Sequence, residues 1–192
     1  IRTPEGEINK SLKKGVDPKS GVRVTLSGEF DYDMKNRFAL RSMKELLNIR
    51  LREEIREEKG GVYGVGVWTR TNHYPEANYN VNIQFNTDPK RVDELLGSVE
   101  KILTEMRDDE ASKENVDKVK SLLQREYETS IKENGFWMGS IFNFAYNNED
   151  MRQILDMKEM IQTITAESIK EAAEEYLDED NRIQVVLYPE AK

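Results

Sequence analysis

Two segments of this sequence alternate apolar and polar residues so regularly that each is predicted to form a half-buried strand. They cover residues 22–30 and residues 79–86. Successive side chains of a strand point to opposite faces of a sheet, so both segments predict one apolar face and one polar face. In the second segment the polar positions are all amides: Asn80, Asn82, Gln84 and Asn86. An amide-rich face suits a peptide backbone, although an ordinary solvated face is the simpler interpretation.

The remaining patterns predict further strands and a block of helices. Residues 63–71 are expected to pair with 79–86 as a hairpin, and residues 183–188 form a last strand. Helices are predicted from Met34 to a stop at Gly60–Gly61, and over 89–106, 112–131, 136–146, 151–161 and 165–177. We expect the aromatic-rich helix 136–146 to pack in the core, with a groove-lining role as the alternative.

This order of elements indicates the fold class. Its main elements follow the order β-α-β-β-α-α-β, which indicates an α+β fold with a mostly antiparallel sheet covered on one face by helices. We expect residues 1–21, which hold Pro4, Gly6, Gly15, Pro18 and Gly21, to be an entering linker. Residues 22–192 then form a single domain.

Composition excludes several classes of function. With 37 acidic and 29 basic residues, and no strong basic cluster, the chain is not expected to bind nucleic acid. No apolar run reaches the roughly 20 residues needed to cross a bilayer, so no membrane partner is expected. The chain has no cysteine and one histidine, His73. Two zinc-binding histidines cannot be built from one, and His73 is expected to be a solvated residue of a hairpin loop.

The run Arg56-Glu57-Glu58-Lys59-Gly60-Gly61-Val62-Tyr63 carries the most specific signal. It closely resembles the C-terminal-half signature of the insulinase/pitrilysin family of zinc metallopeptidases, in which an Arg and a Tyr are separated by six residues. The resemblance extends over nearly the whole chain from about residue 15, and includes Thr165–Ile169 and Val185–Pro189. By this resemblance, the strand that usually opens this unit in the family is expected to be absent or truncated before residue 15.

The resemblance implies a clamshell of two related halves that enclose a peptide. The zinc would lie in the partner N-terminal half, which carries H-x-x-E-H, whereas this chain would bind no metal and be inactive alone. Tyr63 would donate its hydroxyl to the carbonyl oxygen as negative charge develops there, and Arg56 would hold a backbone carbonyl of the peptide substrate. Without the resemblance, an Arg56–Glu53 surface pair and a packing role for Tyr63 would be the simpler interpretations.

Other functions remain open from the sequence. The alternative from another class is a catalytically silent assembly or structural subunit of the same superfamily. A hydrolase that uses Glu53, Glu54, Glu57 and Glu58 is a weaker alternative, because these residues lie on a helix surface. A missing edge strand would leave an open sheet edge through which the fragment could self-associate. Similarity to bacterial members of the family indicates that the protein is located in the cell envelope, specifically the periplasm, or in the cytoplasm.

Overall fold

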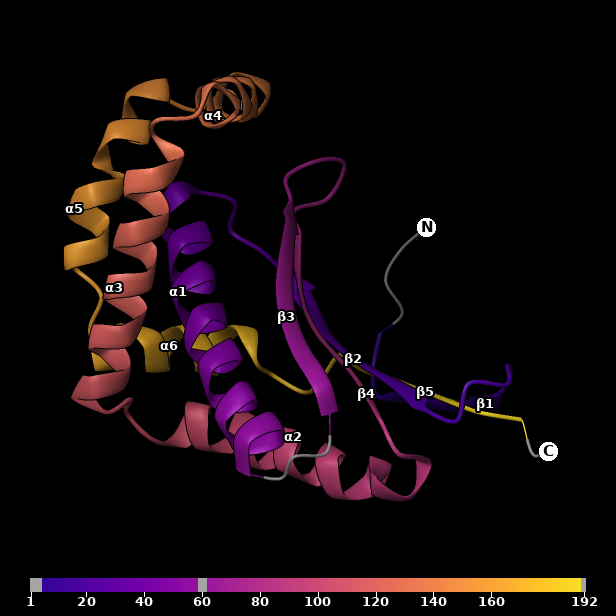
Figure 1. Ribbon diagram of the computed structural model, residues 1–192. Helices are drawn as coiled ribbons and strands as arrows, with labels where there is room; N and C mark the ends of the chain where they lie inside the picture. The colour runs from indigo at the N-terminus through magenta and orange to yellow at the C-terminus, as the bar shows by residue number, and fades with distance from the viewer. Residues whose placement is uncertain (1–4, 59–61, 191–192) are drawn as a thin grey trace.

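The centre of the molecule is a mixed five-stranded sheet, seen in a computed structural model that describes residues 5–58 and 62–190 (Figure 1). The strands are β1 (Ile8–Lys13), β2 (Ser20–Glu29), β3 (Val62–Asn72), β4 (Asn78–Thr87) and β5 (Arg182–Tyr188). Their order across the sheet is β1-β5-β2-β4-β3. Only the β1–β5 pair is parallel, so the prediction of a mostly antiparallel α+β fold is confirmed.

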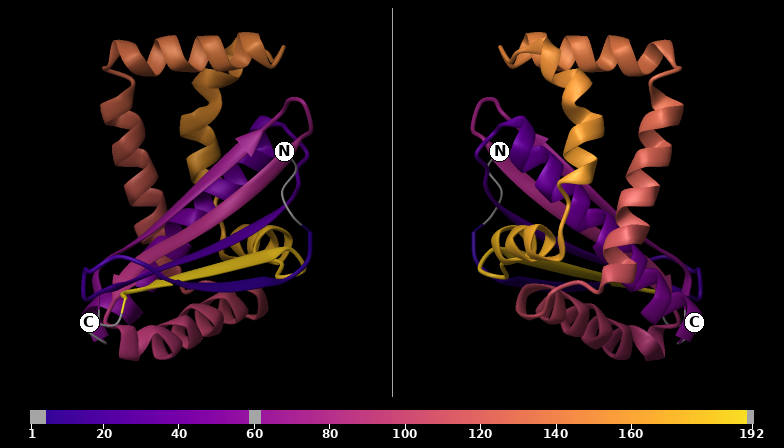
Figure 2. Two further views of the ribbon diagram at one scale, coloured as in Figure 1. Left: turned by 90° about the vertical axis from the view of Figure 1, so that its right-hand side faces the viewer. Right: turned by 90° about the vertical axis from the view of Figure 1, so that its left-hand side faces the viewer.

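Helices cover one face of this sheet and leave the other face bare (Figures 1 and 2). The helical elements are α1 (Met34–Leu51), the π-helical η1 (Arg52–Glu58), η2 (Pro89–Arg91), α2 (Val92–Asp108), α3 (Lys113–Ser130), α4 (Asn134–Tyr146), η3 (Met151–Asp156), α5 (Met157–Gln162) and α6 (Ala166–Tyr176). Helices α1 and α6 contact each other, α1 packs on β3, and α6 packs on β2.

The alternating strands place the core between the sheet and the helices. Register pairs Val24 with Ile83 and Leu26 with Val81, and all four of these side chains are fully buried. The polar residues between them, such as Thr25 and its partner, lie on the bare face. Burial of each large apolar side chain contributes roughly 1.5–3 kcal/mol, so this pattern fixes the register of the sheet.

Local capping explains where several helices begin. Asp33 accepts a hydrogen bond from the backbone of Asn36 at 2.7 Å, and α1 begins at the next residue after Asp33. Ser112 caps α3 in the same way, and Thr165 forms a capping box with Ser168 at the start of α6. Each cap satisfies a backbone N–H that has no partner within its helix. These three predicted boundaries are confirmed.

The opening strand was expected to be absent or truncated before residue 15, and the first of these two alternatives is wrong. Residues 8–13, inside the predicted linker, form β1 and pair with β5 from Ile8↔Ile183 to Lys13↔Tyr188. The physical reason is that β5 has a free edge beside it, which a polar segment can cover through backbone hydrogen bonds alone. Five of the six β1 residues are exposed, so the strand carries little of the apolar alternation that would reveal it.

The expectation that helix 136–146 packs in the core is also wrong. Of α4, only Phe144 is buried, whereas five large side chains are exposed: Trp137, Met138, Ile141, Phe142 and Tyr146. Figure 2 shows α4 lying across the ends of two other helical segments, α3 and η3–α5, and roughly perpendicular to them. The apolar composition of α4 therefore does not lead to its burial among the described residues.

Candidate functional site

The predicted site lies where the helical layer passes into the edge strand of the sheet. Residue 56 belongs to η1, which continues α1, and residue 63 is near the beginning of β3. The neighbouring Ile55 is fully buried, and η1 packs against β3 and α2, so η1 belongs to the packed body. The side chains of Arg56 and Tyr63 lie outside the described residues, and their predicted roles stay predictions.

Two glycines leave open space beside this junction. Gly64 and Gly66 follow Tyr63 along β3, and a Cβ atom built on either one meets no described atom within 4 Å. Gly66 is paired with Gln84, so it belongs to the bare face of the sheet. A strand register shift between Val62 and Val65 adds a local irregularity at the same place. Another backbone can therefore approach this end of β3 closely.

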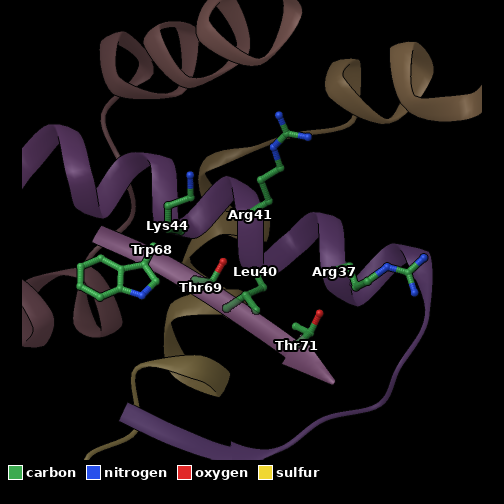
Figure 3. Close-up of a pocket in the computed structure, with 7 residues that line it drawn as sticks. All are labelled: Arg37, Leu40, Arg41, Lys44, Trp68, Thr69 and Thr71. Atoms are coloured by element: carbon green, nitrogen blue, oxygen red, sulfur yellow. The ribbon is translucent and has the colours of Figure 1, made fainter. Parts of the chain in front are cut away.

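A groove of about 320 Å³ runs farther along β3, between this strand and α1 (Figure 3). Its lining residues are Arg37, Leu40, Arg41, Lys44, Trp68, Thr69 and Thr71. β3 is the last strand in the sheet order, and Trp68 belongs to its bare face whereas Thr69 belongs to its helix-covered face. The groove is lined by residues from both faces of β3. Because the other edge of β3 is paired with β4, these residues can line one groove only at the outer edge of β3.

The cationic wall of this groove was missed in the sequence analysis. Arg37, Arg41 and Lys44 are spaced by four and three residues, which places them on one face of α1 and could have revealed the cluster. Each has an acidic partner. Arg37 binds Glu149, Arg41 binds Glu126 at 2.8 Å, and Lys44 binds its neighbour Glu45, which is buried.

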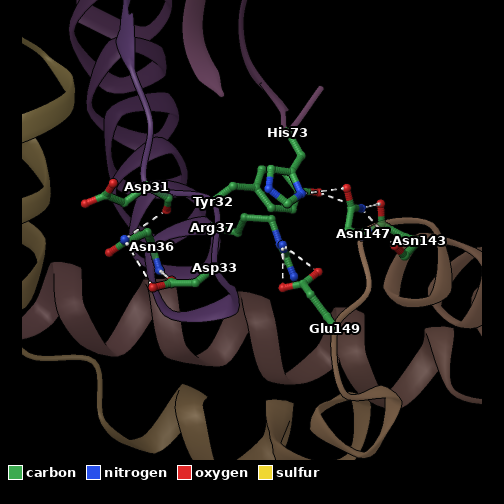
Figure 4. A network of polar contacts seen from close by, with 9 residues as sticks. All are labelled: Asp31, Tyr32, Asp33, Asn36, Arg37, His73, Asn143, Asn147 and Glu149. Atoms are coloured by element: carbon green, nitrogen blue, oxygen red, sulfur yellow. Dashed lines mark hydrogen bonds and ion pairs between the residues drawn. The ribbon is translucent and has the colours of Figure 1, made fainter. Parts of the chain in front are cut away.

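His73 is not the solvated loop residue that we expected, although it does lie in the β3–β4 loop. Its ring stacks on Tyr32 with centroids 4.7 Å apart and on Tyr74 at 4.2 Å. Its Nδ1 lies 3.2 Å from Oδ1 of Asn147, a buried residue that follows α4 (Figure 4). The loop histidine thus joins the hairpin to the C-terminal end of α4.

The aromatic row continues from this histidine onto α4. Tyr74 meets Tyr146 edge to face at 5.9 Å, and Tyr146 stacks on Phe142 at 6.0 Å. Arg37 lies over the Tyr32 ring, 4.5 Å from its centre, and donates from Nη1 to both carboxylate oxygens of Glu149 at 3.0 and 2.9 Å. These contacts fix the end of α4 against α1 and the hairpin (Figure 4).

The amide row of the bare face is internally bonded. Asn82 donates to Asn80 at 2.7 Å and accepts from Thr25 at 2.9 Å, and Gln84 accepts from Arg23 at 2.7 Å. Arg23 also lies over Trp68 at 5.4 Å. These half-exposed amides keep further donors and acceptors, which suit either water or a peptide backbone.

The described residues bring together no set of zinc ligands. Among residues 5–58 and 62–190, no three His, Asp or Glu side chains come together as metal ligands. The ring of His73 contacts Asn147 and stacks on Tyr32 and Tyr74. Glu53 pairs with Lys118 at 3.1 Å. The ion pair of Glu53 gives no support to a catalytic role for that carboxylate. No helix in the same described residues is long and apolar enough to cross a membrane.

Comparison with known proteins places these features in a family. The sequence profile of the peptidase M16 inactive domain matches residues 3–123. The chain is 22% identical over 182 residues to the "probable zinc protease PqqL" of Haemophilus influenzae, covering 90% of this chain and 19% of that protein.

Solved structures show the same fold. The periplasmic protease PqqL from Escherichia coli has a TM-score of 0.83 at 19% identity, over 97% of this chain and 21% of that chain. A peptidase M16 inactive domain from Pseudomonas fluorescens has a TM-score of 0.80 at 20% identity, over 99% of this chain and 45% of that chain. The chain thus spans about a fifth of the PqqL proteins. It belongs to the peptidase M16 family of zinc proteases and matches the inactive domain of that family.

Proposed function

We propose that this chain is the substrate-binding, non-catalytic C-terminal domain of a zinc endopeptidase. It contributes Arg56 and Tyr63 to an active site whose zinc is held by the N-terminal half. The observation that carries this proposal is the position of the Arg/Tyr pair in an M16 inactive domain, at the passage from η1 into the open edge strand β3. Zinc activates the attacking water in such enzymes, and this chain's part is to hold the peptide and stabilise charge.

Tyr63 is assigned the role of oxyanion donor. Its phenolic O–H donates to the carbonyl oxygen of the scissile bond as negative charge develops there, and Arg56 donates to a neighbouring backbone carbonyl. The open space at Gly64 and Gly66 supports this role, because a substrate backbone can lie against the strand beside Tyr63. One such donor contributes about 3–4 kcal/mol to transition-state stabilisation in a site that excludes water.

The partner is a zinc-binding half, either on the same polypeptide or on another chain. Two observations support it. The chain covers 45% of the Pseudomonas fluorescens structure, so that relative contains more protein than this unit. In addition, α4 exposes large apolar side chains, Met138 at 72% and Phe142 at 70%, that a folded monomer normally covers. Self-association of the isolated fragment through the open edge of β3 is a further prediction of the same kind.

The parent protein is proposed to be an enzyme of the bacterial cell envelope. The support is that the structurally similar Escherichia coli PqqL is a periplasmic protease.

The test compares peptide cleavage by the parent protein with Tyr63 and with Tyr63→Phe. We expect kcat to fall by about 10²–10³ with KM nearly unchanged, since the lost hydrogen bond forms only in the transition state. Tyr74→Phe, which removes an exposed hydroxyl on the hairpin, is the matched control and should leave kcat unchanged. The isolated chain should not cleave the peptide even with zinc.

Other outcomes separate the alternatives. An inactive parent would favour the catalytically silent assembly subunit. Cleavage by the isolated chain would contradict the assignment of zinc to the other half. An active parent in which Tyr63→Phe keeps full turnover would refute the oxyanion role while leaving the family assignment intact.

A further inference from the structure

A small cavity lies between α1 and the helices α3, α4 and α5. Its volume is about 90 Å³. Figure 2 shows α4 lying across the ends of α3 and the η3–α5 segment, and α4 contributes Phe136, from its first turn, to the lining. Among the described residues that line the cavity, none belongs to the sheet. The cavity is therefore a feature of the helical layer, apart from the predicted Arg56 and Tyr63 site.

The walls of this cavity are mainly apolar. Phe38, Leu123 and Ile161 are buried, and Phe136 and Met157 lie partly buried beside them. Water is a poor occupant of such a space, because a buried water needs several polar partners. An apolar group that enters gains dispersion contacts that the walls of an unfilled cavity lack. Since one water takes up about 30 Å³, the space suits a branched group of about three or four carbon atoms.

Arg41 brings a cation to this apolar lining. Its side chain extends from α1 away from β3 in Figure 3, and its Nη2 donates to Glu126 on α3 at 2.8 Å. The guanidinium therefore reaches toward α3 rather than toward the strand. A guanidinium carries five N–H donors, so one bond to Glu126 leaves donors for a ligand. Arg41 and Glu126 are 40% and 43% exposed, so a ligand carboxylate can share or replace this partner at little cost.

We propose that this cavity binds a short branched carboxylate, with its aliphatic group among Leu123, Met157 and Ile161 and its carboxylate on Arg41. The planar fork of a guanidinium matches a carboxylate, whereas a ligand ammonium would be repelled. Two sources share this chemistry: a free branched acid and the C-terminal leucine of a peptide. The proposal does not depend on the catalytic role of Tyr63, because the cavity lies in another part of the chain.

The first experiment titrates 3-methylbutyrate into the chain and follows the methyl groups of the protein by NMR. The methyl signals of Leu123, Met157 and Ile161 should shift, whereas those of Val24 in the sheet core should not. A dissociation constant on the order of 1 mM is expected for a ligand of about seven heavy atoms. Acetate lacks the apolar group, and 3-methylbutyramide lacks the charge, so each should bind at least about tenfold more weakly.

A neutral double variant tests the carboxylate contact. Arg41→Gln/Glu126→Gln removes both charges of the half-exposed pair and should weaken 3-methylbutyrate about tenfold, while binding of the amide stays the same. Lys113→Gln/Asp117→Asn neutralises another exposed pair of α3, outside the cavity, and is the matched control. Equal losses in both variants, or none in the first, would refute the role of Arg41.

A second variant tests the cavity without altering a charge. Ser130 lines the cavity at the end of α3, so Ser130→Leu should fill the space and abolish the ligand-induced shifts. Thr129→Leu adds the same side chain at an exposed neighbouring position and should leave binding unchanged. Urea unfolding shows whether each variant is folded. Full binding by a folded Ser130→Leu chain would place the ligand elsewhere and overturn the proposal.

Peptides distinguish the two sources of the carboxylate. The tripeptide Ala-Ala-Leu presents the same branched group beside a free C-terminal carboxylate, and its C-terminal amide is the control. Shifts with the free tripeptide and not with its amide would assign the cavity to peptide ends. Shifts with 3-methylbutyrate alone would assign it to a free acid, and no shift with either would refute the site.

Discussion

Two arginines near the C-terminal end of α4 make similar contacts in different surroundings. Arg37 donates to Glu149 with both side chains largely buried and lies over the rings of Tyr32 and Phe144. Arg152 donates from Nε to Asp150 at 3.0 and 2.9 Å, but its side chain is 88% exposed. The hydrogen-bond distances are alike, whereas burial makes only the first pair costly to break.

Arg37→Ala should therefore destabilise the chain, whereas Arg152→Ala should not. We expect the first substitution to lower the free energy of unfolding by about 3 kcal/mol, because it leaves the Glu149 carboxylate buried without its cation. An exposed pair contributes little in water, so Arg152→Ala should produce no measurable change. Urea unfolding of both variants gives the comparison, and equal effects would contradict the importance of burial here.

Tyr79 gives the chain a predicted sensitivity to alkaline pH. Burial, with smaller contributions from Asp178 and Glu175, raises the pKa of the Tyr79 hydroxyl to about 12 from its usual 10.0. The stability from the protonated hydroxyl is complete below pH 10, the pKa in the unfolded chain. It is lost as the pH rises toward 12, since the unfolded chain releases its proton first.

The measurement is the free energy of unfolding between pH 9 and pH 12, for the unaltered chain and for Tyr79→Phe. The unaltered chain should lose stability with a steeper slope, because Phe has no proton to release. At neutral pH, Tyr79→Phe should cost about 1 kcal/mol through its hydrogen bond to the Glu175 carbonyl. Identical slopes would show that Tyr79 does not control this loss.

At the scale of elements, α4 is held by contacts at its C-terminal end, whereas most of its large apolar side chains are exposed. Met138→Lys/Phe142→Lys should change the free energy of unfolding of the isolated chain by less than about 0.5 kcal/mol, since both side chains are mostly exposed. The same variant should fail to associate with the zinc-binding half in a pull-down of the two halves. Phe144→Ala, on the buried side of the same helix, should instead cost about 3 kcal/mol.

A large loss of stability in the double lysine variant would mean that α4 packs within the isolated chain. Unchanged association with the zinc-binding half would mean that another surface makes the contact.

Elements with strong periodicity could be predicted from the sequence, and those held by distant contacts could not. The strands at 22–30 and 79–86, and the helices capped by Asp33, Ser112 and Thr165, follow local rules. β1 depends on the free edge of β5, which lies at the other end of the chain. The Arg/Tyr motif could be found by its spacing, whereas the groove could not, because it needs the packing of α1 against β3.

At the scale of the whole molecule, the layers follow from the alternating strands. One face of the sheet is apolar and the helices cover it, whereas the other carries the amide row and stays bare. This division was predictable, since a strand of period two with one apolar face needs only one covering layer. The role of the bare face was not predictable, because an amide row suits both solvent and a peptide backbone.

The position of β5 has a consequence for how this domain is made in the cell. β5 is the last of the described strands along the sequence, yet it lies between β1 and β2, and its register joins Ile8 to Ile183. Among the described strands β1 pairs only with β5, so on the ribosome it lacks this partner until residues 182–188 emerge. Pairings between residues so distant in the sequence form slowly. The sheet of the nascent domain therefore stays incomplete until β5 has been synthesised. Premature termination before β5 would therefore remove an internal strand of the sheet and leave β1 detached.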